Sequence, residues 1–446
     1  MKRILWVMLG VLLISSLILA SCSSAPSSPS TPAPTTTAAP PVKTTTPPAP
    51  PSTTAAPPPA TSSPAPPPGS PAPAAIKIGV MTSVTGPDAS SGGPSQFAYQ
   101  LAIDDINKAG GVFVKAYNKK IPLAMDLRDN QTDPEKVMAS AEQINADGCP
   151  VAVGTTLGGI AASLFEKNKL PFVVGQQSIV ALTKAGFKYY FNIDKLNSGQ
   201  SAGIFAMTAS LPKGSVPTKW AFLEEQADWV MELAGIMKQD AAKQGITFSY
   251  EGQYQMLAPD MSQLLIGAKN SGAEVIVGAP TTPDAITLLK QMLQLNYHPK
   301  AIIFFRAGDD PSWGDLGPLG NYVIGSPQWT AGLMYKDPGV QALVAAWKAK
   351  TGKDGGNPCL GPSYASIQLV AAAIEKAGSL DRSAIRDAIA SIDVKTVIGQ
   401  IKLDPTGVRI DAPLTVEQWQ NGVMQLVWPV GPDNDTKPVI WPIPQQ

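Results

Sequence analysis

Histidine and cysteine are nearly absent from this chain, which has one His and three Cys among its 446 residues. The three cysteines are far apart in the sequence, so they cannot supply a structural zinc site or a CxxC pair. A metal-dependent hydrolase is therefore nearly excluded, and we expect neither a metal nor another cofactor.

Charge is also scarce, since only 15% of the residues are Asp, Glu, Lys or Arg. Lys plus Arg and Asp plus Glu both number 34, so no basic excess exists for nucleic acid or an anionic membrane surface. We expect no nucleic-acid partner. The hydrophobic fraction of 44% and the length together favour more than one domain, because a single core rarely grows so large.

The N-terminus is predicted to be an export signal over residues 1–22. Two basic residues near its start precede an apolar run at 4–19, which is short for a membrane-spanning helix. The run ends in Leu-Ala-Ser-Cys at 19–22, which resembles a bacterial lipobox. That resemblance implies that Cys22 becomes the new N-terminus and carries the lipid, while an ordinary signal peptide with a chance cysteine is the alternative.

Residues 23–75 consist almost entirely of Pro, Ala, Ser and Thr, with one charge, Lys43. Such a segment cannot form a packed core, and its prolines favour an extended polyproline II tether that advances roughly 3.1 Å per residue. A ligand for SH3-like modules is the competing interpretation. It is disfavoured because those partners are cytoplasmic and this segment follows an export signal.

The rest of the chain alternates predicted strands and helices. The segment at 76–82 reads as a strand, the turn residues at 86–88 follow, and a helix is expected from about 96 to 108. A second strand at 123–127 precedes a helix with an Asp-Pro-Glu start at 133–135. Further short apolar runs lie at 151–153, 172–174, 220–223, 275–277 and 302–305. This alternation predicts α/β architecture, with parallel sheets covered by helices on both faces.

The C-terminal third has a different pattern. Three helices are expected at 337–351, 362–377 and 382–391. Short strands are expected at 399–403, 415–418 and 423–428. Gln-Asn-Gly at 420–422 predicts a hairpin between the last two strands, and irregular chain is expected beyond Pro429.

Several of these segments resemble one known family. The motifs are Ile-Lys-Ile-Gly-Val at 76–80 with Thr-Gly-Pro at 85–87, Ala-Ile-Asp-Asp-Ile-Asn at 102–107 with Ala-Gly-Gly-Val at 109–112, Asp129 with Gln-Thr-Asp-Pro-Glu-Lys at 131–136, and Tyr-Ala at 364–365 in a helix ending Lys-Ala-Gly at 376–378. In order and spacing they are similar to the substrate-binding lipoproteins of branched-chain amino acid ABC transporters.

The resemblance implies a type I periplasmic binding protein fold with two Rossmann-like lobes, central parallel sheets and three crossing segments. Lobe one would comprise 76–194 plus 329–396, and lobe two 195–328 plus 397–446. The ligand would lie in the cleft between the lobes, which would close around it. The implied function is a lipid-anchored, extracytoplasmic, monomeric protein that delivers a small polar solute to an ABC permease and its ATPase. The same fold could serve a sensing receptor instead.

By the same resemblance, lobe one would hold a ligand carboxylate at the helix start after its third strand and at a hydroxyl residue after its fourth. The matching residues are Thr155, Thr156, Gly158, Gln176 and Ser178. A helix N-terminus stabilises an anion without a basic side chain. The match is partial, because Gly158 stands where amino acid binders commonly have a hydroxyl.

In lobe two, Trp229 matches the position where the family places an aromatic ring over the ligand. Thr281 is also expected to contact the ligand, and Trp329 is a further candidate to line the cleft. Arg306 lies at or beside the place of the acid that holds an ammonium in amino acid binders. Arg306 therefore points to a second acidic or carbonyl group on the ligand. Two alternatives remain: Asp309 or Asp310 turns inward and restores the amino acid pattern, or Arg306 is a surface residue paired with one of these aspartates.

One motif suggests a hydrolase. Residues 199–203 match G-x-S-x-G around Ser201, with His298 downstream and Asp228 or Asp284 as a third member. The motif requires a tight turn directly from strand to helix, and the predicted strand before it ends several residues too early. We therefore expect a helix capped by Asn197 or Ser198, not a nucleophile, and the protein is predicted not to be an enzyme.

Export makes a disulfide between Cys149 and Cys359 chemically possible. Two separate buried thiols are the simpler expectation, because pairing geometry cannot be read from sequence.

Overall fold

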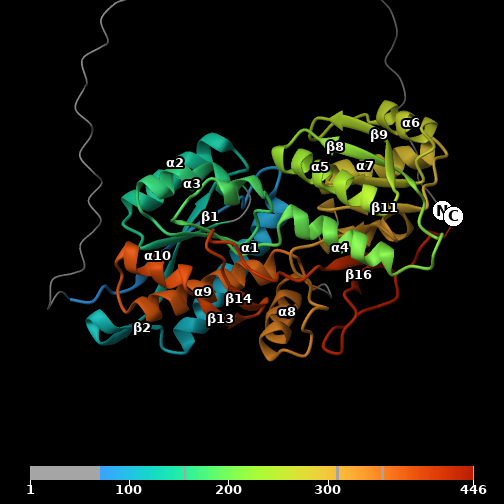
Figure 1. Ribbon diagram of the computed structural model, residues 1–446. Coiled ribbons are helices and arrows are strands. Elements are labelled where there is room, and N and C mark those ends of the chain that lie inside the picture. The colour runs from blue at the N-terminus through green and yellow to red at the C-terminus, as the bar shows by residue number, and fades with distance from the viewer. Residues whose placement is uncertain (1–70, 155–156, 308–310, 353–355, 445–446) are drawn as a thin grey trace, which may run out of the picture. The chain divides into compact units, whose positions relative to one another are not determined.

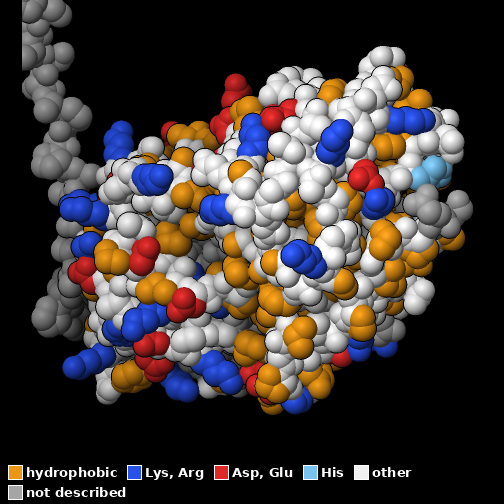
Figure 2. Space-filling model, turned by 45° about the vertical axis from the view of Figure 1, so that its right-hand side comes forward, with side chains coloured by type: hydrophobic (Ala, Val, Ile, Leu, Met, Phe, Trp, Pro, Cys, Tyr) orange, Lys and Arg blue, Asp and Glu red, His pale blue; other side chains and the backbone are white. Residues whose placement is uncertain are grey.

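The computed structural model describes residues 71–154, 157–307, 311–352 and 356–444 (Figure 1). The predicted export signal with Cys22 and the tether up to residue 70 lie outside these ranges. None of the helices in the described ranges is long and apolar enough to cross a membrane. Basic and acidic side chains are scattered among uncharged ones on the face that Figure 2 shows.

The first sheet is parallel throughout and has the strand order β4-β1-β5-β6-β7. Its strands are β1 (Ile76–Thr82), β4 (Leu123–Asp129), β5 (Val151–Gly154), β6 (Phe172–Val174) and β7 (Tyr190–Asn192). Helices α1 (Ala89–Lys108) and α9 (Leu360–Ala377) cover one face, and α2 (Pro134–Ala146) and α3 (Gly158–Lys167) cover the other. Val151 and Val153 pack on the first pair of helices and Ala152 on the second. Burial on both faces explains why β5 is continuously apolar.

The second sheet has the order β16-β15-β12-β11-β10-β8-β9, with the last five strands parallel. Its strands are β8 (Lys219–Glu225), β9 (Thr247–Tyr254), β10 (Val275–Gly278), β11 (Ala301–Phe304), β12 (Ile324–Gly325), β15 (Val416–Gln420) and β16 (Val423–Trp428). Helices α4 (Asn197–Ala209) and α5 (Asp228–Lys243) cover one face, and α6 (Ser262–Asn270) and α7 (Thr282–Gln294) cover the other. The predicted α/β class with two parallel sheets is confirmed.

The remaining described elements are short or lie against the first core. The helices are α8 (Pro338–Thr351), α10 (Arg382–Ala390) and the 3-10 helices η1 (Lys115–Tyr117), η2 (Ala181–Lys184) and η4 (Pro311–Gly320). The strands form two antiparallel ladders, β2 (Val112–Val114) with β3 (Lys119–Ile121) and β13 (Asp393–Thr396) with β14 (Gly399–Lys402). The expected hairpin between β15 and β16 is present, with positive φ angles of 53° at Asn421 and 76° at Gly422. A two-residue turn of this kind requires both.

The predicted start of the first helix at residue 96 is wrong, because α1 begins at Ala89. Gly92 and Pro94 lie inside its first turns. A Cβ on Gly92 would stand 1.8 Å from the carbonyl oxygen of Ser83, so the helix can approach β1 this closely only with glycine there. Strand β13 was not predicted.

The predicted lobe boundaries remain a prediction. Val397, Ile398, Ile401 and Leu403 pack in the core of the first sheet. This packing favours an end of the first lobe later than residue 396.

The two cysteines are buried and are not bonded to each other. Cys149 donates to Oδ2 of Asp126 at 3.5 Å. Burial, with a further contribution from Asp126, raises the pKa of the Cys149 thiol to about 12. The expectation of two separate thiols is confirmed.

The chain passes between the sheets three times: after β7, after β12 and after β14. Lys195, in the first passage, is 2% exposed and connects all three. Its Nζ donates to Oγ of Ser326 at 3.0 Å in the second passage and to Oγ1 and O of Thr415 at 2.8 and 3.0 Å in the third. The carboxyl groups of Asp194 and Glu417 are also buried beside it. We call these five residues the crossing cluster.

Glu417 should make the unfolding free energy depend on pH. Burial raises its pKa from 4.5 to about 7, although Thr330 and Lys195 oppose the shift. The folded state therefore holds this proton where the unfolded state has lost it, and the stability it confers is lost as pH rises through about 7. We expect Glu417→Gln to gain roughly 1–3 kcal/mol relative to wild type between about pH 5 and pH 8, measured by urea unfolding. The surface variant Glu142→Gln serves as control, and a pH-independent difference for Glu417→Gln would contradict this assignment.

Candidate functional site

The carboxyl ends of the two parallel sheets border a cavity of about 610 Å³. Strand order reverses at β1 and β5 in the first sheet and at β8 and β10 in the second. Ligands of open α/β sheets bind at such reversal points. The described residues that line the cavity are Pro87, Asp88, Ser91, Thr132, Leu157, Gly159, Ile160, Gln176, Gln177, Ser178, Ile179, Leu182, Gln200, Glu225, Ala227, Asp228, Trp229, Met256, Thr281, Phe305, Arg306, Gln328 and Cys359.

The part of the cavity wall that follows β6 is polar and uncharged at Gln176, Gln177 and Ser178. Gln176 follows β6, and its Nε2 donates to Oγ of Ser95 at 2.9 Å and to Oγ of Ser363 at 3.3 Å. These bonds hold the amide in place from behind the cavity. Ser178 is 7% exposed, and its hydroxyl forms no hydrogen bond to another described residue. The Ser178 hydroxyl is therefore available to a ligand.

The start of α3 contributes Leu157 and Gly159 to the cavity wall. Gly158 is not among the lining residues, because it packs on β6. A Cβ there would lie 2.7 Å from Cγ1 of Val174, which explains the glycine without a ligand. Thr155 and Thr156 lie outside the described residues, so their predicted role stays a prediction.

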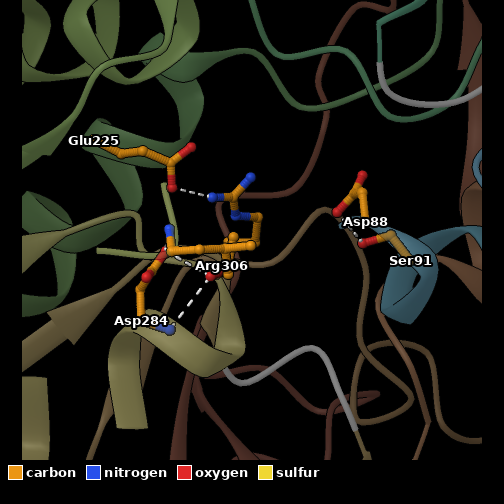
Figure 3. A network of polar contacts seen from close by, with 7 residues as sticks. Asp88, Ser91, Glu225, Asp284 and Arg306 are labelled. Atoms are coloured by element: carbon orange, nitrogen blue, oxygen red, sulfur yellow. Dashed lines mark hydrogen bonds and ion pairs between the residues drawn. The ribbon is translucent and has the colours of Figure 1, made fainter. Parts of the chain in front are cut away.

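The other end of the cavity contains a buried ion pair. Arg306 follows β11, and its Nη2 contacts Oε2 of Glu225 at the end of β8 (Figure 3). The side chains are 18% and 1% exposed, respectively. The guanidinium lies over the ring of Trp229, 5.4 Å from its centroid. Burial raises the pKa of Glu225, and the charge of Arg306 opposes this shift.

This pairing differs from the sequence prediction, which considered only Asp309 and Asp310 as partners of Arg306. Both aspartates lie outside the described residues. Glu225 was missed, although it follows the predicted strand at 220–223 and so lies at a carboxyl end. Its position at the end of a predicted strand is the feature of the sequence by which Glu225 could have been identified.

Thr281 lines the cavity, but its hydroxyl has an internal partner. It caps α7, and its Oγ1 donates to Oδ2 of Asp284 at 2.6 Å. Asp284 is 1% exposed and lies beside the Glu225–Arg306 pair (Figure 3). Thr281 therefore positions an acid near the cavity as well as contributing to its wall.

Asp88 is a second residue that the sequence reasoning missed. It is the residue before α1 and was assigned only to a turn. Its carboxylate lines the cavity and accepts a hydrogen bond from Oγ of Ser91 at 3.2 Å. The early start of α1 brings Asp88 to this place.

Trp329 does not line the cavity. It is 1% exposed and belongs to the core of the first sheet, where its ring packs on Gly361. Its expected contact with the ligand is therefore not supported by its position.

The residues of the hydrolase alternative lie apart. Ser201 is fully buried in α4, and its hydroxyl donates to Oδ2 of Asp240 at 2.7 Å. His298 is exposed in the loop before β11 and contacts Oδ1 of Asn296 at 2.8 Å. The helix begins at Asn197, whose predecessor Leu196 occupies the cap position, so neither Asn197 nor Ser198 caps it as predicted.

Two α/β units whose strand ends border one cavity are typical of a binding protein with its ligand site between two lobes. A model of the periplasmic binding protein family matches residues 75–423, and the chain belongs to this family. The protein is accordingly a binding protein and not an enzyme.

The similarity to known proteins extends over most of the chain. The chain is similar to the leucine-, isoleucine-, valine-, threonine- and alanine-binding protein of Pseudomonas aeruginosa, with 26% identity over 363 residues, covering 77% of this chain and 90% of that protein. It superposes with a TM-score of 0.67 and 20% identity on the branched-chain amino acid transporter substrate binding protein LivJ of Streptococcus pneumoniae in complex with isoleucine, covering 80% and 100% of the two chains. A solute binding protein of an ABC transporter from Rhodopseudomonas palustris, in complex with 3,4-dihydroxy benzoic acid, gives a TM-score of 0.65 at 20% identity and covers 80% and 94%.

Proposed function

We propose that this protein is a lipid-anchored, extracytoplasmic solute-binding protein that captures a small polar organic solute and delivers it to an ABC importer. The observation that carries the proposal is the cavity at the carboxyl ends of both sheets, lined by residues of each. A ligand that touches both lobes stabilises the closed state, because only that state offers all the contacts. Relatives that bind aliphatic amino acids, and one solved with an aromatic acid, support this class of solute.

The predicted export signal with Cys22 supports the anchored location, and the predicted tether would hold the lobes away from the membrane. A permease and an ATPase would then be the partners. Transport requires no covalent change in the ligand.

A thermal-shift screen over amino acids, aliphatic and aromatic carboxylates and amides tests the proposal. A solute that binds only the folded state raises stability by RT ln(1 + [L]/Kd). We expect at least one of these solutes to raise the melting temperature. No shift with any of them would contradict the function.

We expect the carboxylate of the solute to bind at the start of α3 and at Ser178. We expect Ser178→Ala to weaken binding of the strongest solute about five- to tenfold, because one hydrogen bond to a charged group is lost. Isothermal titration calorimetry measures the effect. Ser163→Ala, on the exposed face of α3, is the matched control. Equal affinity of Ser178→Ala and Ser163→Ala would exclude this hydroxyl from the site.

A further inference from the structure

The far end of the cavity carries charges of both signs that face one another. Figure 3 shows Asp88 with Ser91 on one side and Arg306 with Glu225 on the other. Asp88 belongs to the start of α1, whereas Arg306 and Glu225 follow strands of the second sheet. All three residues line the cavity. A ligand group placed between them meets an acceptor on one side and a donor on the other.

Arg306 does not act as a free cation here. Glu225 neutralises it, and the guanidinium lies over the ring of Trp229. The pair leaves Arg306 able to donate hydrogen bonds with little net charge to attract an anion.

Asp88 retains its charge toward the cavity. Its carboxylate is held by the Ser91 hydroxyl, and no described basic residue forms an ion pair with it. Its charge reaches the opposite wall, since it contributes to the raised pKa of Glu225. The cavity lining also contains Asp228, so acids outnumber the single arginine among the described lining residues.

These charges disfavour both kinds of ion. A second carboxylate on the ligand would be repelled by Asp88 and would gain little from a neutralised Arg306. An ammonium offers no acceptor to the N–H donors of Arg306, and Arg306 already lies over the ring of Trp229, 5.4 Å from its centroid. A planar group that carries N–H donors and a carbonyl acceptor satisfies both walls and can lie against the indole of Trp229.

We propose that Asp88 and Arg306 together select a neutral carboxamide at the far end of the ligand, with Asp88 accepting from its N–H groups and Arg306 donating to its carbonyl. This inference rests on the proposed function, since it names the class of solute for that site. It revises the sequence-based expectation that Arg306 takes an acidic group.

Matched ligands on one scaffold test the selection. Para-carbamoylbenzoate, terephthalate and para-(aminomethyl)benzoate place an amide, an acid or an amine at the same distance from a common carboxylate. L-glutamine, L-glutamate and L-ornithine form an aliphatic set. In at least one set, we expect the amide to bind wild type about tenfold or more tightly than its acid and amine partners in calorimetric titrations.

The charges are then removed one at a time. Asp88→Asn should shift the preference about tenfold toward the acid, and Arg306→Gln about tenfold toward the amine. The double variant Glu225→Gln with Arg306→Gln should show the same shift toward the amine without leaving a buried carboxylate unpaired. Asp104→Asn, an exposed acid of the helix that follows Asp88 that does not line the cavity, is the control and should leave the order unchanged.

The inference is overturned if an acid or amine binds wild type best, or if neither Asp88→Asn nor the double variant changes the order. It is also overturned, with the proposed function intact, if no member of either set binds while other solutes raise the melting temperature. If no solute in the screen binds, the proposed function fails as well.

Discussion

Replacing Lys195 by methionine should lower the free energy of unfolding by about 3–5 kcal/mol. Methionine fills a similar volume but removes the Nζ donor from Ser326 and Thr415 and the Lys195 cation from beside the buried carboxyl groups of Asp194 and Glu417, of which Asp194 keeps Arg409 as a nearby cation. When one member of a buried polar network is removed, the remaining groups stay desolvated without their hydrogen-bond partner, which destabilises the folded state. Urea unfolding followed by circular dichroism measures the loss.

Lys213→Met is the control, because Lys213 is exposed and a surface substitution changes stability by no more than about 0.5 kcal/mol. A loss for Lys195→Met of less than about 1 kcal/mol would show that the crossing cluster adds little to stability. The partners of Lys195 belong to segments 131 and 220 residues away in sequence, so its loss should loosen all three passages at once.

The alternation of strands and helices could be predicted from the sequence because it depends on local features. Short apolar runs such as β5 and β10 are bounded by turn residues and lie between amphipathic segments. The hairpin at Asn421 and Gly422 was predictable for the same reason, since its turn requires particular residues at two adjacent positions. The first helix was predicted too short because glycine and proline ordinarily indicate a break. Close packing of Gly92 on Ser83 reverses that preference here.

The site was predictable only in part. Trp229, Ser178, Gln176, Thr281 and Arg306 all line the cavity, and each follows a predicted strand or begins a helix. Their partners could not be found in this way. Glu225 and Arg306 are 81 residues apart and meet because β10 alone separates their strands in the sheet. Strand order is a property of the whole fold, which no local pattern contains.

Lys195 shows the same limit. In sequence it is one residue of a short link between β7 and α4, with nothing to distinguish it from a solvated lysine. Its burial depends on two other passages of the chain that arrive much later in the sequence. Such a residue can be recognised only once the crossings are assembled.

Replacing Trp229 by alanine should weaken binding of the strongest solute at least about tenfold, or roughly 1.4 kcal/mol. The indole forms one wall of the cavity and supports the guanidinium of Arg306, so the variant loses apolar contact area and the surface that orients a donor. The backbone should be little affected, because the carbonyl of Trp229 keeps its hydrogen bond from Nδ2 of Asn197 at 3.0 Å. Calorimetry is preferred to fluorescence, since the substitution removes one of the nine tryptophans that would report binding.

Two further variants separate the roles of the ring. Trp229→Phe keeps an aromatic face and should retain part of the affinity, while Tyr335→Ala removes an exposed aromatic that does not line the cavity and should retain all of it. If Trp229 acts partly by orienting Arg306, then Trp229→Ala and Arg306→Gln will not be additive, and the double variant will lose less than the sum of the two. Additive losses would mean that the ring contacts the solute independently. Affinity unchanged in Trp229→Ala would remove this residue from the binding site and leave the Glu225–Arg306 pair as a purely structural contact.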